Sequence, residues 1–302
     1  MSEADVATVR LPARPRRANL FVANGRALVS RVRAGEPVKP ALARAIDLLG
    51  GLGKLVRPGD AIFLKPNCNS PDPLPAATDL GFLRATIELL QEAGAGQITI
   101  GERCGRAYGF TTRQTLDRLG VLDLARELDV KVACFDEEEW VEVELGGRYL
   151  PRLELPRVAY EADKRIYLPC LKAHRQARFT MALKVAFGFS NLRGREFLHA
   201  GNLEEKTAEI SLAWQPDLIL MDGRKAFVTD GPQSGTLVEP GLILASGDLV
   251  ANDVEGVKIL QGYNAQNRLG MDPWQLPQIA TAVAHGLGVR GADEYQVVGD
   301  AV

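Results

Sequence analysis

The sequence has no long apolar run and little excess of charge of either sign. No segment approaches the roughly 18 consecutive apolar residues of a membrane span, and no charged start leads into an apolar signal segment. The 36 Lys and Arg residues against 38 Asp and Glu give a formal net charge of -2, so the basic footprint of a nucleic-acid-binding protein is missing. We therefore expect a cytoplasmic protein whose partner is a small molecule, with no nucleic acid and no membrane. A homodimer stays open.

The chain also lacks closely spaced cysteines. Its four cysteines lie far apart, which excludes the CxxC signature of a zinc ribbon and the ferredoxin run. In a cytoplasmic chain they are expected to be thiols or ligands rather than disulfides. The Gly-rich stretch from Gly231 to Gly235 matches neither a P-loop nor the dinucleotide fingerprint, and its Gly-Pro content favours a turn.

What the chain does contain is the composition of a globular protein and the pattern of an α/β fold. Of its 302 residues 46% are hydrophobic and 25% charged. Short apolar runs bounded by polar residues, such as 61–64, are typical of strands buried on both faces, and amphipathic helical patterns follow them. The sequence predicts mostly parallel sheets flanked by helices, in two lobes with the site between them. We expect a flexible basic arm over residues 1–17, an N-terminal α/β lobe over 18–160 and a C-terminal α/β lobe over 161–302.

The segment from Lys164 to His199 has the composition of a functional site. A short apolar strand runs into a turn at Pro169, and polar residues follow at once. In an open α/β sheet, ligands bind beyond the carboxyl ends of the strands. His174 and His199 are predicted to move protons because imidazole titrates nearest neutral pH, and Lys172 is placed with them as a catalytic group. The alternative is a histidine that backbone hydrogen bonds satisfy.

A set of cations predicts a site for a carboxylate or phosphate. Lys65, Lys172, Lys184 and Arg193 each accompany a predicted strand end or a glycine, and Arg193 offers a bidentate fork. The alternative is a set of surface cations. The predicted substrate-binding residues are Lys65, Asn67, Lys184, Arg193 and Asp222.

Three cysteines form the third predicted group. Cys68, Cys104 and Cys170 each follow the end of a different predicted strand within a few residues, so they converge if those strands share a sheet. Three thiolates around an open position would suit a 4Fe-4S cluster with one free iron, or a zinc ion that keeps a water. The alternative is three buried cysteines that act as small hydrophobic side chains.

Motifs between residues 60 and 260 resemble the family catalogued as domain of unknown function 362. The resemblance implies a two-lobed α/β fold and an enzyme of unsettled chemistry. Three departures from the family pattern stand out: the appended ferredoxin-type segment of many relatives is missing, Val185 follows Lys184 where the family often has Asn, and the three cysteines occupy unexpected places. The matching motifs are Lys65-Pro66-Asn67, Gly101-Glu102, Leu171 to His174 with Thr180, Lys184 to Gly188, Arg193 with His199, Asp222-Gly223, Gly231-Pro232 with Gly235, and Asp248 to Asp253.

Together these patterns predict an enzyme that binds a small anionic substrate. A lyase or hydratase type of reaction follows if a cluster or metal on the three cysteines acts as a Lewis acid. Two alternatives stay open: a redox enzyme that passes electrons through an iron-sulfur cluster, and a non-catalytic protein that binds an anion or a metal.

Overall fold

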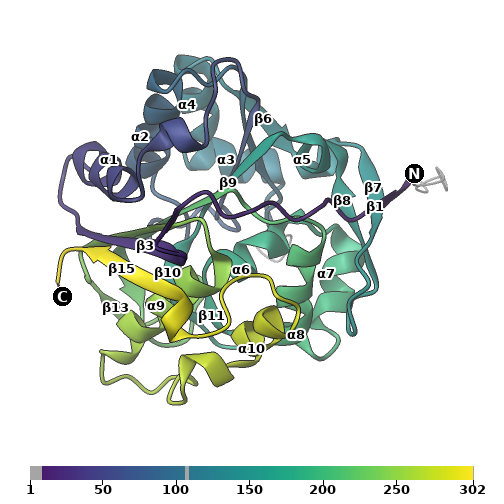
Figure 1. Ribbon diagram of the computed structural model, residues 1–302. Helices are drawn as coiled ribbons and strands as arrows, with labels where there is room; N and C mark the ends of the chain where they lie inside the picture. The colour runs from purple at the N-terminus through teal and green to yellow at the C-terminus, as the bar shows by residue number, and fades with distance from the viewer. Residues whose placement is uncertain (1–8, 106–108, 302) are drawn as a thin grey trace.

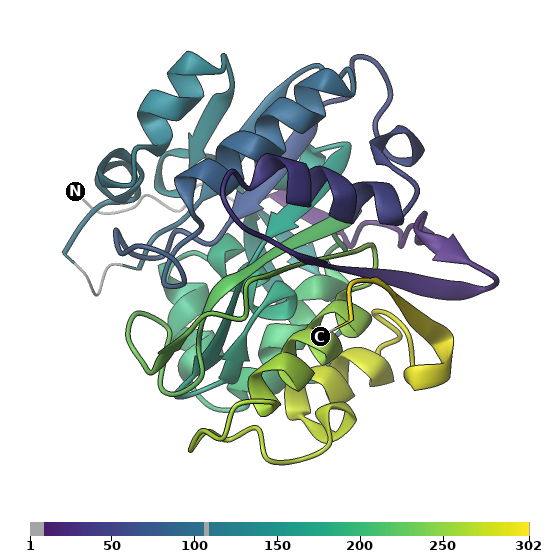
Figure 2. The ribbon, with the colours of Figure 1, turned by 90° about the vertical axis from the view of Figure 1, so that its left-hand side faces the viewer.

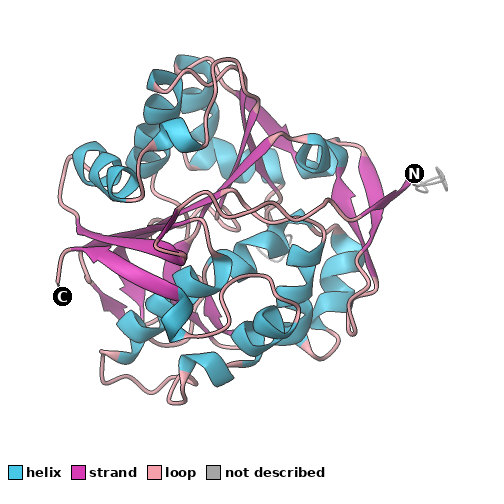
Figure 3. Cartoon of the chain, viewed as in Figure 1, coloured by secondary structure: helices cyan, strands magenta, loops and turns pink. Residues whose placement is uncertain are grey.

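The computed structural model describes residues 9–105 and 109–301, and it is an α/β protein built on one large sheet (Figure 1 and Figure 3). Most neighbouring strands of this sheet are parallel, while β14 (Leu242–Ser246) runs antiparallel to both of its neighbours. This confirms the predicted fold class. Along the sheet, in spatial order, lie β15 (Tyr295–Gly299), β3 (Arg26–Arg33), β14, β12 (Leu218–Phe227), β9 (Lys164–Leu168), β4 (Ile62–Pro66), β5 (Ile98–Glu102) and β6 (Lys131–Cys134).

Four further described strands pair beside this path, and three form a small separate sheet. In the small sheet β7 and β8 are the two arms of the hairpin that the Gly146-Gly147 turn predicts. The additional strands of the main sheet are β2 (Val22–Ala23), β10 (Cys170–His174), β11 (Arg178–Thr180) and β13 (Leu237–Val238); those of the small sheet are β1 (Val9–Pro12), β7 (Trp140–Glu144) and β8 (Arg152–Pro156).

Helices cover both faces of the main sheet, as Figure 2 shows with the purple and blue helices above it and the green and yellow ones below. On one face lie α1 (Lys39–Leu48), α2 (Leu80–Glu92), α3 (Thr112–Arg118) and α4 (Val121–Glu127). On the other lie α5 (Arg157–Glu161), α6 (Ala182–Val185), α7 (Leu192–His199), α8 (Leu203–Glu209), α9 (Leu249–Gln261) and α10 (Pro277–Ala284). Short 3-10 turns join them: η1 (Leu52–Lys54), η3 (Phe135–Glu137), η4 (Ala186–Phe189), η5 (Ile210–Leu212), η6 (Pro273–Gln275) and η7 (Ala292–Glu294).

The strands carry apolar side chains on both faces because both faces are covered. In β4, Ile62 and Leu64 point into the core below α1 and α2, while Phe63 points into the core on the other side. Successive side chains of a strand alternate between faces, so a run that is apolar throughout belongs between two helical layers. Two of the helices begin at capping carboxylates: Asp79 caps α2 by accepting from Phe82 N (3.0 Å), and Asp248 caps α9 by accepting from Ala251 N (2.8 Å).

The N-terminal segment is anchored over its described part. Residues 9–12 form β1, which pairs in parallel with β7. Arg14 donates from Nε to Tyr160 O (3.0 Å), and Arg16 donates from Nη1 to Gly286 O (2.8 Å). The flexible basic arm over residues 1–17 stays a prediction; in the structure residues 9–17 contact the rest of the chain, and residues 1–8 lie outside the described part. The boundary at 160/161 stays a prediction, and the main sheet continues across it.

The polar segment that follows the turn at Pro169 is a strand. β10 pairs in parallel with β12 and antiparallel with β11. Side chains along β10 alternate, so Cys170, Lys172 and His174 share one face of the strand. Across residues 9–105 and 109–301, no helix combines the length and the hydrophobicity that crossing a bilayer requires.

Candidate functional site

A pocket of about 520 Å³ opens beyond the carboxyl ends of β4, β5 and β10. This is the edge where open α/β sheets bind ligands. The pocket wall brings together six of the predicted residues, and it does not include Arg193, Asp222 or the three cysteines Cys68, Cys104 and Cys170. The six are Lys65, Asn67, Lys172, His174, Lys184 and His199.

Arg195 occupies the place that the sequence assigned to Arg193. Helix α7 begins after Asn191, whose Oδ1 accepts from Gly194 N (2.7 Å). Residues four apart share a helix face, so Arg195 and His199 both reach the pocket. Arg193 is exposed and lies outside the pocket wall. The signal that identifies Arg195 is its spacing from His199, and it was missed because this stretch was not recognised as a helix.

Asp222 is held in an ion pair away from the pocket. Its carboxylate accepts from Arg224 Nη2 (2.8 Å), and the same guanidinium pairs with Asp79 (2.7 Å). Asp222 is buried with its oxygens engaged and does not line the pocket, and its role in substrate binding stays a prediction. The lining residues that sequence reasoning did not assign to the site include Arg103, Arg195, Glu196, Pro232 and Gln233.

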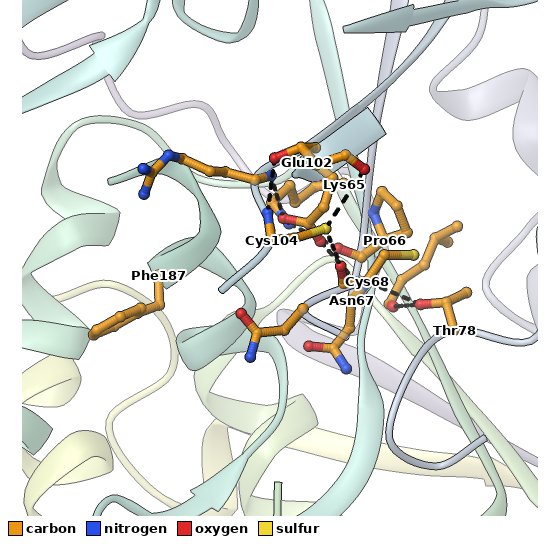
Figure 4. A network of polar contacts seen from close by, with 12 residues as sticks. Lys65, Pro66, Asn67, Cys68, Thr78, Glu102, Cys104 and Phe187 are labelled. Atoms are coloured by element: carbon orange, nitrogen blue, oxygen red, sulfur yellow. Dashed lines mark hydrogen bonds and ion pairs between the residues drawn. The ribbon is translucent and has the colours of Figure 1, made fainter. Parts of the chain in front are cut away.

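Lys65 and Glu102 form a buried ion pair at the ends of β4 and β5 (Figure 4). Lys65 Nζ lies 2.6 Å from Glu102 Oε1 and donates to Pro66 O at 2.7 Å. Glu102 also accepts from the backbone N–H groups of Cys68 and Arg103, both at 2.8 Å. The charge of Lys65 is thus neutralised inside the protein, and its main role in the described structure is to join two strand ends.

Because Gly188 has no side chain, the 3-10 turn η4 can lie close to this ion pair. A Cβ on Gly188 would lie 2.6 Å from both Lys65 Nζ and Glu102 Oε1. The next residue, Phe189, packs against the rings of Phe63 and Phe135 with centroid distances of 6.1 and 5.7 Å. Aromatic packing therefore fixes the position of η4 and, with it, one wall of the pocket.

Asn67 and Lys172 meet at one backbone carbonyl. Asn67 Nδ2 donates to Ala76 O at 3.0 Å, and Lys172 Nζ donates to the same oxygen at 2.6 Å. Burial lowers the pKa of Lys172 from 10.5 to about 8. Its ammonium is bonded to a neutral carbonyl rather than to a carboxylate, so its charge remains uncompensated.

Lys184 and Arg195 add two more cations. Nζ of Lys184 lies 4.4 Å from the centroid of the Phe187 ring, and across residues 9–105 and 109–301 it has no hydrogen bond and no carboxylate partner. Burial, with repulsion from Arg195 and Lys172, lowers the pKa of Lys184 from 10.5 to about 7. Arg195 donates to Asn69 Oδ1 (3.2 Å) and to a backbone carbonyl. Neither Lys184 nor Arg195 forms an ion pair with a carboxylate among the described residues, although Glu102 and Glu196 also line the pocket.

His174 is fixed in one tautomer. Its Nδ1 accepts from the backbone N–H groups of Gln176 (3.2 Å) and Ala177 (3.0 Å), which places the ring proton on Nε2. Burial and the nearby Lys184 and Lys172 lower the pKa of His174 to about 2, so the ring stays neutral. A neutral ring with Nε2–H presents a hydrogen-bond donor. Loss of the Nδ1 acceptor would leave two backbone donors unsatisfied, which opposes a role as base.

His199 lies in a different environment from His174. It is exposed, and its ring packs edge-on against Phe187 at a centroid distance of 5.2 Å. Burial, with Lys184 and Arg195 nearby, lowers its pKa from the ordinary 6.5. His199 is therefore a neutral, solvent-accessible imidazole in the pocket wall.

Two buried polar atoms of the wall have no partner. Thr180 Oγ1 and Arg195 Nε are shielded from solvent and make no hydrogen bond within residues 9–105 and 109–301. A buried polar group without a partner costs about 1–3 kcal/mol. Since both belong to pocket residues, a ligand that accepts from them would recover that cost.

The three cysteines are buried near one another, and each thiol has its own contacts. Cys68 packs in the core below α1 and α2, Cys104 donates from Sγ to Cys68 O (2.7 Å), and Cys170 lies 3.7 Å from Asn67 Nδ2. Burial raises the pKa of Cys104 to about 12 and that of Cys170 to about 11. Within residues 9–105 and 109–301, no three His, Cys, Asp or Glu side chains are grouped to hold a metal ion. These thiols do not fit a ligand set as they stand, and no step below uses a cluster.

Gly231→Ala is expected to disturb the pocket through the loop that carries Pro232 and Gln233. Gly231 has φ +66, and a Cβ there would overlap the backbone oxygen of Ala173 in β10. We expect a loss of about 2–4 kcal/mol in unfolding free energy, from backbone strain and this overlap. Gly241→Ala is the matched control: it has the same φ of +66 with open space around the new Cβ. Equal losses in urea unfolding would show that the contact with Ala173 contributes nothing.

Comparison with known proteins gives the family. A family model described as domain of unknown function (DUF362) matches residues 62–258. The chain belongs to this family. This confirms the resemblance that the motifs indicate. Thylakoid-associated protein sll1697 from Synechocystis is 31% identical over 288 residues, covering 82% of this chain and 85% of that protein.

Two solved structures share part of the arrangement at low identity. The lactate racemase apoprotein from Thermoanaerobacterium thermosaccharolyticum has a TM-score of 0.49 and 15% identity, and the match covers 80% of this chain and 57% of that one. A protein from Thermotoga maritima has a TM-score of 0.44 and 10% identity, with 76% and 59% covered. The chain thus spans under two thirds of each structure, and likeness at this level says nothing about activity or ligand.

Proposed function

We propose that this protein is an enzyme that binds a small carboxylate or phosphate in the pocket and moves a proton on it, as lyases and hydratases do. The observation that carries the proposal is a pocket wall with uncompensated cations and unpartnered buried donors. Lys172, Lys184 and Arg195 supply positive charge, and Thr180 Oγ1 and Arg195 Nε supply free hydrogen-bonding capacity. An anion would satisfy all of them at once.

The roles of the pocket residues follow from their partners. His174 Nε2–H donates to an oxygen on which negative charge develops, as a neutral electrophile. The amine of Lys184, whose pKa is about 7, accepts or donates a proton near neutral pH. Lys65 is already paired with Glu102, and it supports the wall rather than the anion.

Anion binding is expected to depend on Lys184 and Arg195 and to be indifferent to Arg193. Titration of the protein with phosphate, sulfate, malonate and pyruvate at pH 6.5, followed by calorimetry, measures it. Lys184→Met and Arg195→Met should each weaken binding at least tenfold, since each removes a cation from the wall. Arg193→Met is the matched control, because Arg193 is an exposed cation on the same helix as Arg195. Equal weakening by all three variants, or no binding by wild type, would contradict the proposal.

Hydrogen-deuterium exchange tests proton transfer separately from anion binding. Small 2-hydroxy acids incubated with the protein in D2O should exchange the hydrogen on C2, next to the carboxylate, for deuterium. Pyruvate, whose C2 carries no hydrogen, should exchange at C3, next to the carbonyl, and proton NMR detects both exchanges. Binding without exchange would identify a protein that holds the anion without turning it over.

The iron-sulfur or zinc hypothesis for Cys68, Cys104 and Cys170 remains a separate proposal. Its support is sequence position at three strand ends, and the thiols would have to turn toward a common ion. Iron, sulfide and zinc analysis after aerobic and anaerobic purification tests it, and metal-free protein from both would remove it. A cytoplasmic location is likewise a proposal, to be weighed by cell fractionation against the thylakoid association in the relative's name.

A further inference from the structure

Lys184 differs from the other buried lysines of the pocket in what its nitrogen contacts. Lys65 has a carboxylate partner and Lys172 a carbonyl partner. Lys184 Nζ has only the face of the Phe187 ring at 4.4 Å, in the part of the chain that the structure describes. Within that part, no acceptor stabilises the ammonium form of this amine and no donor engages its lone pair, so the lone pair is available once the amine loses a proton. That is the condition for a nucleophile.

The backbone that carries Lys184 is held firmly. Asp253, which is fully buried in α9, accepts from Ala182 N and Leu183 N, both at 2.9 Å. These two bonds fix the first turn of α6, and the side chains of Ala182, Leu183 and Val185 are buried in the core. Lys184 and Val185 of this turn line the pocket, and Lys184 is the one that carries a functional group. Its position is set before any ligand arrives.

The surroundings of Lys184 favour the neutral amine. Burial penalises the ammonium form, and Arg195 and Lys172 repel it, so the pKa of Lys184 is lowered to about 7. A lysine desolvated beside another cation is a usual way to obtain a reactive amine at neutral pH. The same cations would hold a carboxylate next to this amine.

We propose that Lys184 forms an imine with the carbonyl carbon of a small 2-oxo acid held in the pocket. This inference rests on the proposed anion site. The nitrogen of Lys184 adds to the carbonyl carbon, and the carbonyl oxygen then leaves as water with the two hydrogens of the amine, giving a C=N bond. No oxidant or reductant takes part. Arg195 and Lys172 bind the carboxylate, and His174 Nε2–H and Thr180 Oγ1 donate to the departing oxygen. The imine would then withdraw electrons from the neighbouring carbon, which supports proton removal there.

Trapping with borohydride tests the imine. The protein is mixed with pyruvate or glyoxylate, reduced with borohydride and digested, and peptides are read by mass spectrometry. We expect one reduced adduct per chain, on Lys184. Lys184→Arg keeps the positive charge and should keep pyruvate binding by calorimetry, but it should give no adduct. Lys172→Arg should still give the adduct on Lys184.

The outcomes separate this inference from the proposed function. Pyruvate and glyoxylate bound by wild type without an adduct would overturn the imine and leave the anion site standing. An adduct that persists on another lysine in Lys184→Arg would also overturn it. Absence of binding by every anion in the panel would overturn both.

Discussion

Replacing Lys65 by Met is expected to lower the free energy of unfolding by about 3–5 kcal/mol. Lys65 and Glu102 are only 1% and 3% exposed, so the pair is shielded from water. Removing the ammonium leaves a buried carboxylate with two backbone N–H partners and no counter-charge. Coulomb attraction at 2.6 Å is lost, whereas the desolvation cost of Glu102 remains.

Urea unfolding measures the loss of unfolding free energy in Lys65→Met, and two further variants serve as comparisons. Arg84→Met breaks an exposed ion pair with Glu127 and should cost less than about 1 kcal/mol, because water screens that pair. The double variant Lys65→Met with Glu102→Gln removes both charges and should recover part of the loss. A loss for Lys65→Met no larger than that for Arg84→Met would mean that Glu102 becomes protonated or finds water at little cost.

The elements that position this ion pair were predictable from sequence because local signals agree there. β4 is a buried apolar run that ends in Lys65, and Asp79 caps the helix that follows it. Strand, loop and capped helix form the unit that builds a parallel sheet. Lys65 directly after a buried strand was therefore assigned correctly to the crevice. That Glu102 neutralises it was not predictable, since this depends on two strands being adjacent.

Other elements were missed because tertiary contacts define them. β10 carries Lys172 and His174 in a strand, and neither residue is typical of a buried one. The strand forms because β11 and β12 flank it and its polar face lines the pocket. β3 and β15 pair with each other in parallel, although their residues are almost the whole chain apart. Local patterns carry no information on such a pairing.

In the candidate site, too, some features followed from the sequence and others depended on tertiary contacts. Its location, at the carboxyl ends of β4, β5 and β10, followed from the general rule for α/β sheets. Which cation enters the pocket depended on a helical face, and Arg195 rather than Arg193 lies on it. His174 was chosen for its pKa, but its backbone partners at Nδ1 decide that it donates. The residue type of His174 indicated a role in proton transfer, and its hydrogen bonds determine that it is a donor rather than an acceptor.

Lys184→Met is expected to raise stability by about 1–3 kcal/mol while it weakens anion binding, because it replaces a partly buried charge that has no ion-pair partner with an apolar side chain of similar size. The pH dependence identifies the cause. The pKa of Lys184 is about 7 in the folded protein, against an ordinary value of 10.5 in the unfolded chain. Below pH 7 the amine is charged in both states and the cost is complete. Between pH 7 and 10.5 the unfolded chain binds more protons, so the stability of the wild type rises with pH.

The gain from Lys184→Met should therefore be larger at pH 6 than at pH 9, as thermal unfolding at the two values measures. Arg193→Met, which removes an exposed cation from the neighbouring helix, should shift stability by less than about 0.5 kcal/mol at both. A destabilised Lys184→Met variant, or a gain independent of pH, would mean that Lys184 has a partner that compensates its charge. The expected result would show that the charge of Lys184 destabilises the folded protein unless an anion is bound. A residue that costs stability in this way is retained for binding rather than for folding.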